Sequence, residues 1–478
     1  MNIPQESERN RIWRCLHCRS PLAEGALELH CTHCGKAYPV IGDVPILVRE
    51  PRAYLRSELS HLIRAARDAR QRRELLDGNQ ADAGLTAVSL ERHRDVMNAE
   101  IAQIDTLLTL LEPVAHMLRK VGAGDDESMT VRRSGWQFDS LIPYLLRDWT
   151  NNAELRAASQ AIGTALRNIL PEPSDKTIVL AGCGAGGLLP EISAGFRRVL
   201  GFDLALAIIA AARHLLDGRT LDLALPRTIR ATGNVSLRRR DGSSESHIDI
   251  LAMDAFDMAF ADDSIDCVIT SFFLDLIPDP RSLAREIHRV LCRNGIWINY
   301  GPSGPLKALW RFDQAECAAF LESAGFTVMQ TEAHRSTYLD ISHDCPSWSF
   351  RNHMCYLVSA KKTRPPAAGA KRAAPSSAEI PDAIPQLFPG ANLIQRRSLG
   401  PEQRQTIVLR HERTPGRPES REIGAEAVQM LLLVDGKRSV RDIATLLEQS
   451  STPISREETI LAFERFFNEG LLAKRHAP

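Results

Sequence analysis

The 478-residue sequence has no net charge, no long apolar run and no cysteine after Cys355. Acidic and basic residues number 59 each, so we expect neither a nucleic acid nor an anionic membrane as a partner. No apolar run reaches the roughly 18 residues that span a bilayer, and the polar start MNIPQESERNR is no signal peptide, so we expect a cytoplasmic protein. The composition is that of a globular protein, and the length predicts roughly three domains.

Four of the ten cysteines lie within the first 34 residues, in CLHCRSPLAEGALELHCTHC, with the spacing C-x2-C-x12-C-x2-C. Each C-x-x-C turn can direct two thiolates at one centre, so Cys15, Cys18, Cys31 and Cys34 are predicted to bind a zinc ion. Four sulfur ligands leave no open position, which predicts a structural zinc. Unligated cysteines or two disulfides are the alternatives, and neither suits a reducing compartment.

The chain divides by its patterning into five segments. Apolar residues at helical spacing predict a helical segment, whereas alternating strand and helix signals predict a doubly wound parallel sheet of the α/β class. The run TRPPAAGAKRAAPSSAEIPDAIP has the composition of a flexible linker. The predicted segments are a zinc ribbon (1–50), a helical segment (51–135), an α/β core (136–362), the linker (363–385) and a last compact unit (386–478).

The segment IVLAGCGAGGLL runs from an apolar strand through four glycines into a helix, which is typical of nucleotide binding. Gly182, Gly184 and Gly186 would form the loop. Asp203 ends the strand RVLGFD and could accept the ribose hydroxyls of any adenosine ligand, while Asp254 could meet the adenine. NAD, FAD and S-adenosylmethionine (SAM) all fit the loop alone, and the order of the following strands and helices favours SAM. The alternative is a glycine-rich turn without a ligand.

Five stretches, LLRDW, GCGAGGL, TSFFLDL, GIWINYGP and STY, resemble the carnosine N-methyltransferase family over about residues 140–361. The resemblance implies a Rossmann-like class I methyltransferase fold, with Arg147 near the SAM carboxylate. It implies that Asp275 holds a substrate imidazole and that Tyr338 lines the same pocket. Leu306 stands where the family carries a histidine, which leaves the identity of the acceptor open.

Two further resemblances concern the ends of the chain. The stretch GKAYPVIGDVPILV resembles the zinc ribbons related to the small activator subunit of tRNA methyltransferases. The stretches LLLVDGKRSVRDIATLL and FFNEGLLAKR resemble PqqD-like domains, which bind the leader of a precursor peptide. A generic winged-helix module is the alternative for this last unit.

Together these features predict a SAM-dependent N-methyltransferase acting on a peptide, at a histidine imidazole of a ribosomally made precursor bound through its leader. A small-molecule methyltransferase of natural-product biosynthesis and a non-catalytic SAM-binding scaffold are the alternatives. The expected cofactors are SAM and a structural zinc ion.

Overall fold

A computed structural model of the chain describes most of its residues. The described ranges are 12–25, 27–78, 86–121, 138–227, 233–240, 248–277, 280–302, 314–338, 351–363, 385–387, 392–397, 405–414, 417–423, 425–435, 437–449, 454–468 and 472–474. The chain forms two compact units, residues 1–304 with 312–367, and residues 305–311 with 368–478. The predicted linker lies almost entirely outside the described residues.

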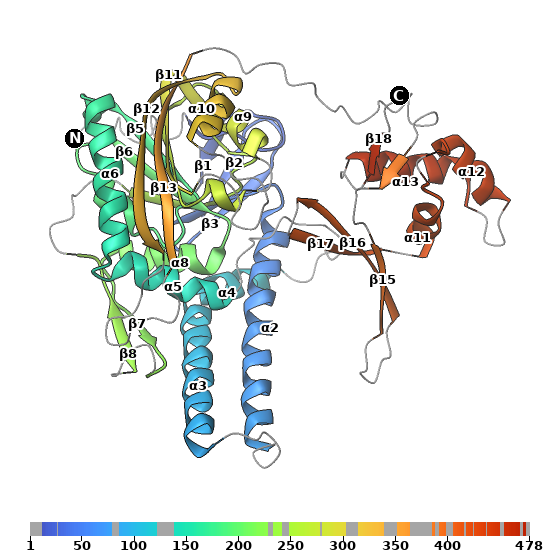
Figure 1. Ribbon diagram of the computed structural model, residues 1–478, viewed down its shortest axis with the longest axis horizontal. Helices are drawn as coiled ribbons and strands as arrows, with labels where there is room; N and C mark the ends of the chain where they lie inside the picture. Colours follow the sequence, from blue (N-terminus) through green and yellow to red (C-terminus); the bar gives the residue numbers. More distant parts are fainter. Residues whose placement is uncertain are drawn as a thin grey trace. The chain divides into compact units, whose positions relative to one another are not determined.

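An eleven-stranded mixed sheet runs through the first unit, in the order β1-β2-β3-β4-β9-β6-β5-β10-β11-β13-β12 (Figure 1). Its strands are β1 (Leu22–Glu24), β2 (Glu28–Cys31), β3 (Ala37–Ile41), β4 (Val44–Leu47), β5 (Thr177–Ala181), β6 (Arg198–Asp203), β9 (Ile248–Met253), β10 (Ile265–Ser271), β11 (Leu291–Gly301), β12 (Phe326–Tyr338) and β13 (Arg351–Lys362). Strands β7 (Leu221–Ala224) and β8 (Asn234–Leu237) form a separate antiparallel pair.

The strand order reverses at β5. From it, β6 and β9 follow on one side and β10 and β11 on the other, all parallel. In such a doubly wound sheet the carboxyl ends of the strands diverge at the switch point and leave a crevice where ligands bind. The predicted parallel core is therefore present. The sheet is mixed because β13 lies antiparallel between β11 and β12.

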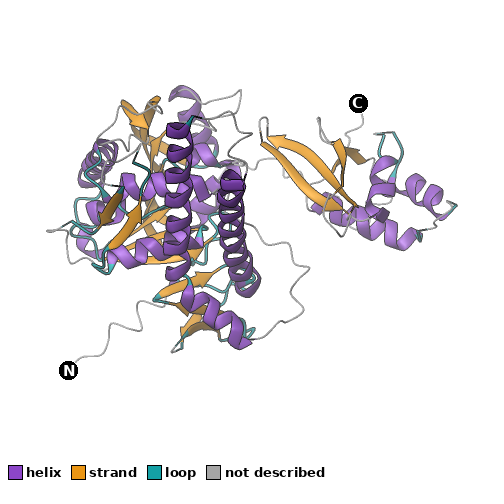
Figure 2. Cartoon of the chain, turned by 90° about the horizontal axis from the view of Figure 1, so that it is seen from below, coloured by secondary structure: helices purple, strands orange, loops and turns teal. Residues whose placement is uncertain are grey.

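Both faces of the sheet are covered by helices and loops (Figure 2). Alternate residues of β5 show this, since Ile178 and Leu180 belong to one buried cluster and Val179 and Ala181 to the other. The helices are α2 (Pro51–Gly78), α3 (Ala87–Leu110), α4 (Glu112–Val121), α5 (Phe138–Trp149), α6 (Ala153–Ile169), α7 (Leu188–Ile192), α8 (Leu206–Leu216), α9 (Pro280–Val290) and α10 (Gln314–Ser323), with 3-10 turns η3 (Pro173–Asp175) and η4 (Leu274–Leu276).

Helices α2 and α3 form a long pair within the stretch where the sequence predicted a helical segment (Figure 1). Leu62 and Ala66 of α2 and Ile104 and Leu107 of α3 are buried in the larger core cluster. Thr86 caps α3 by accepting the N–H of Ser89 at 3.2 Å. Within the described part of the chain, no helix has both the length and the apolar character needed to cross a membrane.

The N-terminal strands are built into the main sheet. Strand β4 pairs in parallel with β9, in the register Ile46 with Ala252 and Leu47 with Met253. Trp13 stacks on Phe260, with ring centroids 5.3 Å apart. The segment that carries the four clustered cysteines therefore shares a hydrophobic core with the α/β fold.

In its described residues, the second unit combines three helices with two small antiparallel sheets. Its elements are β14 (Pro385–Leu387), β15 (Asn392–Arg397), β16 (Gln405–Thr414), β17 (Arg417–Ile423), α11 (Ala425–Leu432), α12 (Val440–Glu448), α13 (Arg456–Asn468) and β18 (Leu472–Lys474). A capping box between Ser439 and Asp442 starts α12. Val440, Ile443 and Phe463 are fully buried in this unit's own core. The apolar stretch QTIVL begins β16.

Candidate active site

The glycine loop joins β5 to α7, and three of its glycines have positive φ angles. Gly182 has φ +66°, and a Cβ there would lie 2.1 Å from the ring of Phe273. Gly184 has φ +54°, yet among the described residues no atom beyond its chain neighbours lies within 4 Å of where its Cβ would be. Gly186 has φ +78°. Glycine is therefore required at Gly182 by a neighbouring side chain, whereas Gly184 faces space that a ligand can enter.

Asp203 ends β6 directly beside this loop. One carboxylate oxygen accepts the N–H of Gly184 at 3.0 Å, and the other accepts the N–H groups of Leu204 at 2.7 Å and Ala205 at 3.0 Å. The residue is 7% exposed. The carboxylate therefore ties the glycine loop to the turn after β6, and its contact with a ribose stays a prediction.

Asp254 lies one strand further along the same edge. Asp203 pairs with Ala252, so Asp254 follows two residues later at the carboxyl end of β9. One of its carboxylate oxygens accepts the N–H of Phe256 at 3.0 Å. The structure thus brings both acids to the carboxyl edge of the sheet.

Helix α5 holds the glycine loop from the other side. Asp148 accepts the N–H of Gly187 at 3.2 Å and, through its second oxygen, the Nε–H of Arg147 at 2.7 Å. The indole N–H of Trp149 donates to the carbonyl of Ala185 at 2.8 Å. We did not predict Asp148 and Trp149 as site residues, although both stand in the motif LLRDW and were open to that interpretation.

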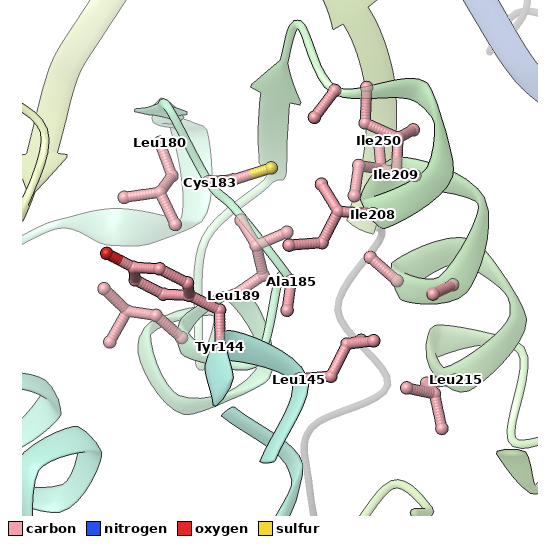
Figure 3. Packing of buried hydrophobic residues seen from close by; sticks show 14 of the residues in the cluster. Tyr144, Leu145, Leu180, Cys183, Ala185, Leu189, Ile208, Ile209, Leu215 and Ile250 are labelled. Atoms are coloured by element: carbon pink, nitrogen blue, oxygen red, sulfur yellow. The ribbon is translucent and has the colours of Figure 1, made fainter. Parts of the chain in front are cut away.

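A pocket opens between α5, α6, the glycine loop and the end of β10, with about 350 Å³ of space including its mouth. Its lining residues are Arg147, Asp148, Glu154, Leu155, Ala158, Leu180, Gly182, Cys183, Leu188, Ser271 and Phe272. Apolar side chains of α5, β5, α7 and α8 pack around the glycine loop beside it (Figure 3). Of the predicted site residues, this lining includes Arg147 and Gly182.

Arg147 is the one cation among these lining residues, and its guanidinium lies 4.8 Å from the ring centre of Tyr144 and 5.7 Å from that of Phe272. Its Nη1 atom lies 3.7 Å from a carboxylate oxygen of Glu154 and has no hydrogen-bond partner among the described residues. Burial alone would lower the pKa of Arg147, but the charges of Asp148 and Glu154 raise it above its ordinary value. A permanent positive charge therefore faces the pocket.

The end of β10 carries the second unusual backbone feature. Phe272 has φ +48°, a left-handed conformation that costs a bulky residue about 1–3 kcal/mol, and its N–H donates to the carbonyl of Tyr300 at 2.8 Å. Asp275 follows in η4 and is 2% exposed. Burial, together with the charges of Glu154 and Asp275, raises the pKa of the Cys355 thiol to about 12, which places both acids near this thiol.

For two predicted positions, the side chain or the whole residue lies outside the described part of the structure. Tyr338 is the last residue of β12, but its side chain lies outside the described residues. Leu306 also lies outside them.

The four N-terminal cysteines form a single cluster. Their sulfur atoms all lie within 4.8 Å of one another, with Cys15 and Cys34 3.5 Å apart and Cys18 and Cys31 3.4 Å apart. Tetrahedral coordination at a zinc–sulfur distance of about 2.3 Å requires a sulfur–sulfur distance of about 3.8 Å. Hydrogen bonds from Ser20 lower the pKa of Cys18 to about 6. The donor set and its spacing therefore fit a zinc ion.

Residues 179–299 match the family model described as a methyltransferase domain. The chain carries a SAM-dependent methyltransferase domain. This methyltransferase domain includes the end of β5, the glycine loop and most of β11, and thus the carboxyl edge on which the site is built.

The chain is also similar to carnosine N-methyltransferase from Drosophila melanogaster, at 24% identity over 187 residues. That match covers 34% of this chain and 40% of the fly protein. Among solved structures, N-methyltransferase NodS from Bradyrhizobium japonicum, in complex with S-adenosyl-L-homocysteine (SAH), shares 16% identity with a TM-score of 0.32, covering 47% of this chain and 97% of NodS. A methyltransferase from Bacillus halodurans shares 16% identity with a TM-score of 0.32, covering 42% of this chain and 98% of that chain.

Proposed function

We propose that this protein is a SAM-dependent N-methyltransferase that methylates a histidine imidazole in a ribosomally made precursor peptide. The observation that carries the proposal is the buried carboxylate of Asp275, which follows β10 at the switch point of the sheet, beside the strand that leads into the glycine loop. The similarity to carnosine N-methyltransferase, whose name denotes methylation of a histidine-containing dipeptide, supports the same acceptor.

The residues at the switch point fit SAM. Gly184 leaves open space beside the loop, and Asp203 places a carboxylate next to it for the ribose hydroxyls. Asp254 would meet the adenine one strand away. Arg147, which lines the pocket and whose Nη1 has no hydrogen-bond partner among the described residues, would bind the carboxylate of the methionyl end. Bound SAM supplies an electrophilic methyl group on a positively charged sulfur.

Asp275 would select the reactive tautomer of the acceptor. A neutral imidazole, with a reference pKa of about 6.5, is nucleophilic at pH 7 and needs no strong base. The carboxylate accepts the N–H of one ring nitrogen, which leaves the lone pair of the other nitrogen free to attack. It then stabilises the positive charge of the methylated ring. Tyr338 would line the same pocket.

The cysteine cluster would bind a structural zinc ion. Cys15, Cys18, Cys31 and Cys34 supply four thiolates, which fill a tetrahedral shell and leave no position for a substrate. The cluster precedes β4, which pairs with β9. We therefore assign the ion a role in folding, as in the zinc ribbons that the segment resembles.

The C-terminal unit would bind the leader of the precursor. Its sheet β15-β16-β17 has β15 and β17 as edge strands, and an extended peptide can add to such an edge through main-chain hydrogen bonds. Binding there would raise the local concentration of the acceptor at the methyltransferase pocket.

Mass spectrometry of histidine-containing peptides incubated with the protein and SAM tests the reaction. We expect a gain of one methyl group on the imidazole. Asp275→Asn should lower kcat by about 100-fold while leader binding persists, because the amide cannot stabilise the cationic product. The exposed Asp175→Asn, on η3 before β5, is the matched control and should leave turnover unchanged. Equal turnover in both variants would show that Asp275 has no role in the reaction.

Truncation after Lys362 tests the role of the C-terminal unit. The apparent KM for a full-length precursor should rise about 100-fold or more, while SAM binding and turnover of a short leaderless peptide at saturation stay nearly unchanged. Equal loss of both activities would mean that the last unit supports the fold instead. If the protein methylated small amines or phenols and accepted no peptide, this result would favour the small-molecule alternative. That alternative is open because Leu306 stands where the resembled family carries a histidine.

A further inference from the structure

The charged residues that line the pocket are two acids and one base. Arg147, Asp148 and Glu154 together carry a net charge of −1, with every other lining residue uncharged or apolar. The guanidinium already binds Asp148 through Nε. Adding the carboxylate of a bound ligand to Arg147 makes the site more negative still, so the complete ligand must bring a positive charge as well.

Glu154 is held in place by the start of α6. Its N–H and that of Leu155 donate to the side-chain oxygen of Asn152, at 2.8 and 3.2 Å, which caps the helix. Its side chain is 1% exposed. The negative charge of Glu154 also acts on residues of β11 and β13. It helps to raise the pKa values of Tyr300 and Cys355, although burial is the largest cause of both increases. Glu154 is thus a buried, preorganised acid on the pocket wall.

The two opposite charges lie side by side. Nη1 of Arg147 and Oε1 of Glu154 are 3.7 Å apart, and that Nη1 has no hydrogen-bond partner among the described residues. An α-amino acid carries a carboxylate and an ammonium group on one carbon atom. The pair on the wall therefore offers one complementary charge to each group of a zwitterion.

We propose that Arg147 and Glu154 together bind the α-amino-acid end of SAM, with Glu154 accepting hydrogen bonds from its ammonium group. This assignment rests on the proposed function, which places the SAM carboxylate at Arg147. Glu154 is a positioning residue: it anchors the methionyl end and thereby directs the sulfonium methyl toward the acceptor.

Calorimetry of three adenosine ligands binding to the full-length protein can distinguish a role of Glu154 at the ammonium group from any other role. SAM and SAH both carry the ammonium group, whereas 5′-methylthioadenosine lacks the whole amino-acid end. Glu154→Gln should weaken SAM and SAH equally, by about ten- to hundredfold, because a charge-assisted hydrogen bond is lost. Binding of 5′-methylthioadenosine should not change. The exposed Glu172→Gln is the matched control and should bind all three as the wild type does.

Other outcomes overturn the assignment. Weakening of SAM with SAH unaffected would mean that Glu154 stabilises the sulfonium. Equal weakening of 5′-methylthioadenosine would mean a structural role, and unchanged binding would mean none. A wild-type protein that binds neither SAM nor SAH would instead contradict the proposed function itself.

A measurement on the wild-type protein covers the case in which the variant does not fold. The SAH analogue 5′-S-(3-carboxypropyl)-5′-thioadenosine keeps the carboxylate and lacks the ammonium group. It should bind about tenfold or more weakly than SAH. Equal affinity for the two ligands would contradict a role for Glu154 at the ammonium group.

Discussion

The cysteine cluster and the pocket are built in opposite ways. The cluster takes its four side chains from two short turns within twenty consecutive positions, and their sulfur atoms meet within 4.8 Å. The pocket takes Arg147 from α5, Glu154 from α6, Gly182 from the loop after β5 and Phe272 from the end of β10. The first constellation is local, whereas the second exists only when the sheet and its helices have packed.

The cysteine segment nevertheless contacts the sheet close to another predicted ligand position, Asp254. Strand β4 pairs with β9, and Arg19, within the first cysteine turn, forms an ion pair with Asp257. Arg49 binds the same carboxylate at 2.6 Å. Asp257 lies three residues after Asp254, the acid expected near the adenine, so damage to the cluster can reach the ligand site.

The largest effect should follow from breaking the cluster. Cys15→Ser removes one of four ligands and should lower the free energy of unfolding by about 4 kcal/mol or more, with loss of about one zinc per chain. Metal analysis and thermal unfolding measure both. Cys292→Ser, at an isolated thiol, is the control and should keep the metal. A Cys15→Ser protein with wild-type zinc content would contradict a zinc site at the four cysteines.

The next effect separates packing from ligand access within the glycine loop. Gly182→Ala should destabilise the protein by about 3 kcal/mol, because its Cβ would overlap the ring of Phe273 and φ is positive. Gly184→Ala carries only the backbone strain of about 1–2 kcal/mol but should abolish tight SAM binding. Thermal unfolding and calorimetry distinguish the two. Equal losses of stability would contradict the distinction.

Asp203 should show an effect of about 2 kcal/mol on SAM affinity. Asp203→Ala loses the ribose contact and, in addition, the acceptor for three backbone N–H groups, so both binding and stability should fall. Asp203→Asn can keep the bonds to Leu204 and Ala205 and should weaken binding with little loss of stability. Wild-type SAM affinity in both variants would show that the ribose lies elsewhere.

The smallest effect concerns a single hydrogen bond that joins α5 to the loop. Trp149→Phe keeps most of the packing but removes the donor to the carbonyl of Ala185, which should cost about 1 kcal/mol of stability. A modest rise in the KM for SAM should accompany it. A change larger than that of Gly182→Ala would mean that α5 matters more to the loop than its own glycines do.

The positions of several site residues could be predicted because each depends on nearby sequence. Strand RVLGFD ends at Asp203, and the carboxyl ends of parallel strands share one edge, so its place beside the loop followed from the pattern. The same reasoning placed Asp254 and Asp275. Glu154, in contrast, follows a helix cap in ordinary polar sequence, and nothing local distinguishes it from a surface acid.

Residue type and spacing were enough to locate the groups whose members are close along the chain: the four cysteines in two turns, the glycine loop after its strand, and the acids at strand ends. Short chain separation restricts where such side chains can go, so spacing and residue type suffice. Other contacts depend on the packed fold: Gly182 makes room for Phe273, Asp148 and Trp149 hold the loop, and Glu154 lies 3.7 Å from Arg147. These contacts join elements far apart in sequence, and burial and packing of the whole sheet select them, which no local pattern encodes.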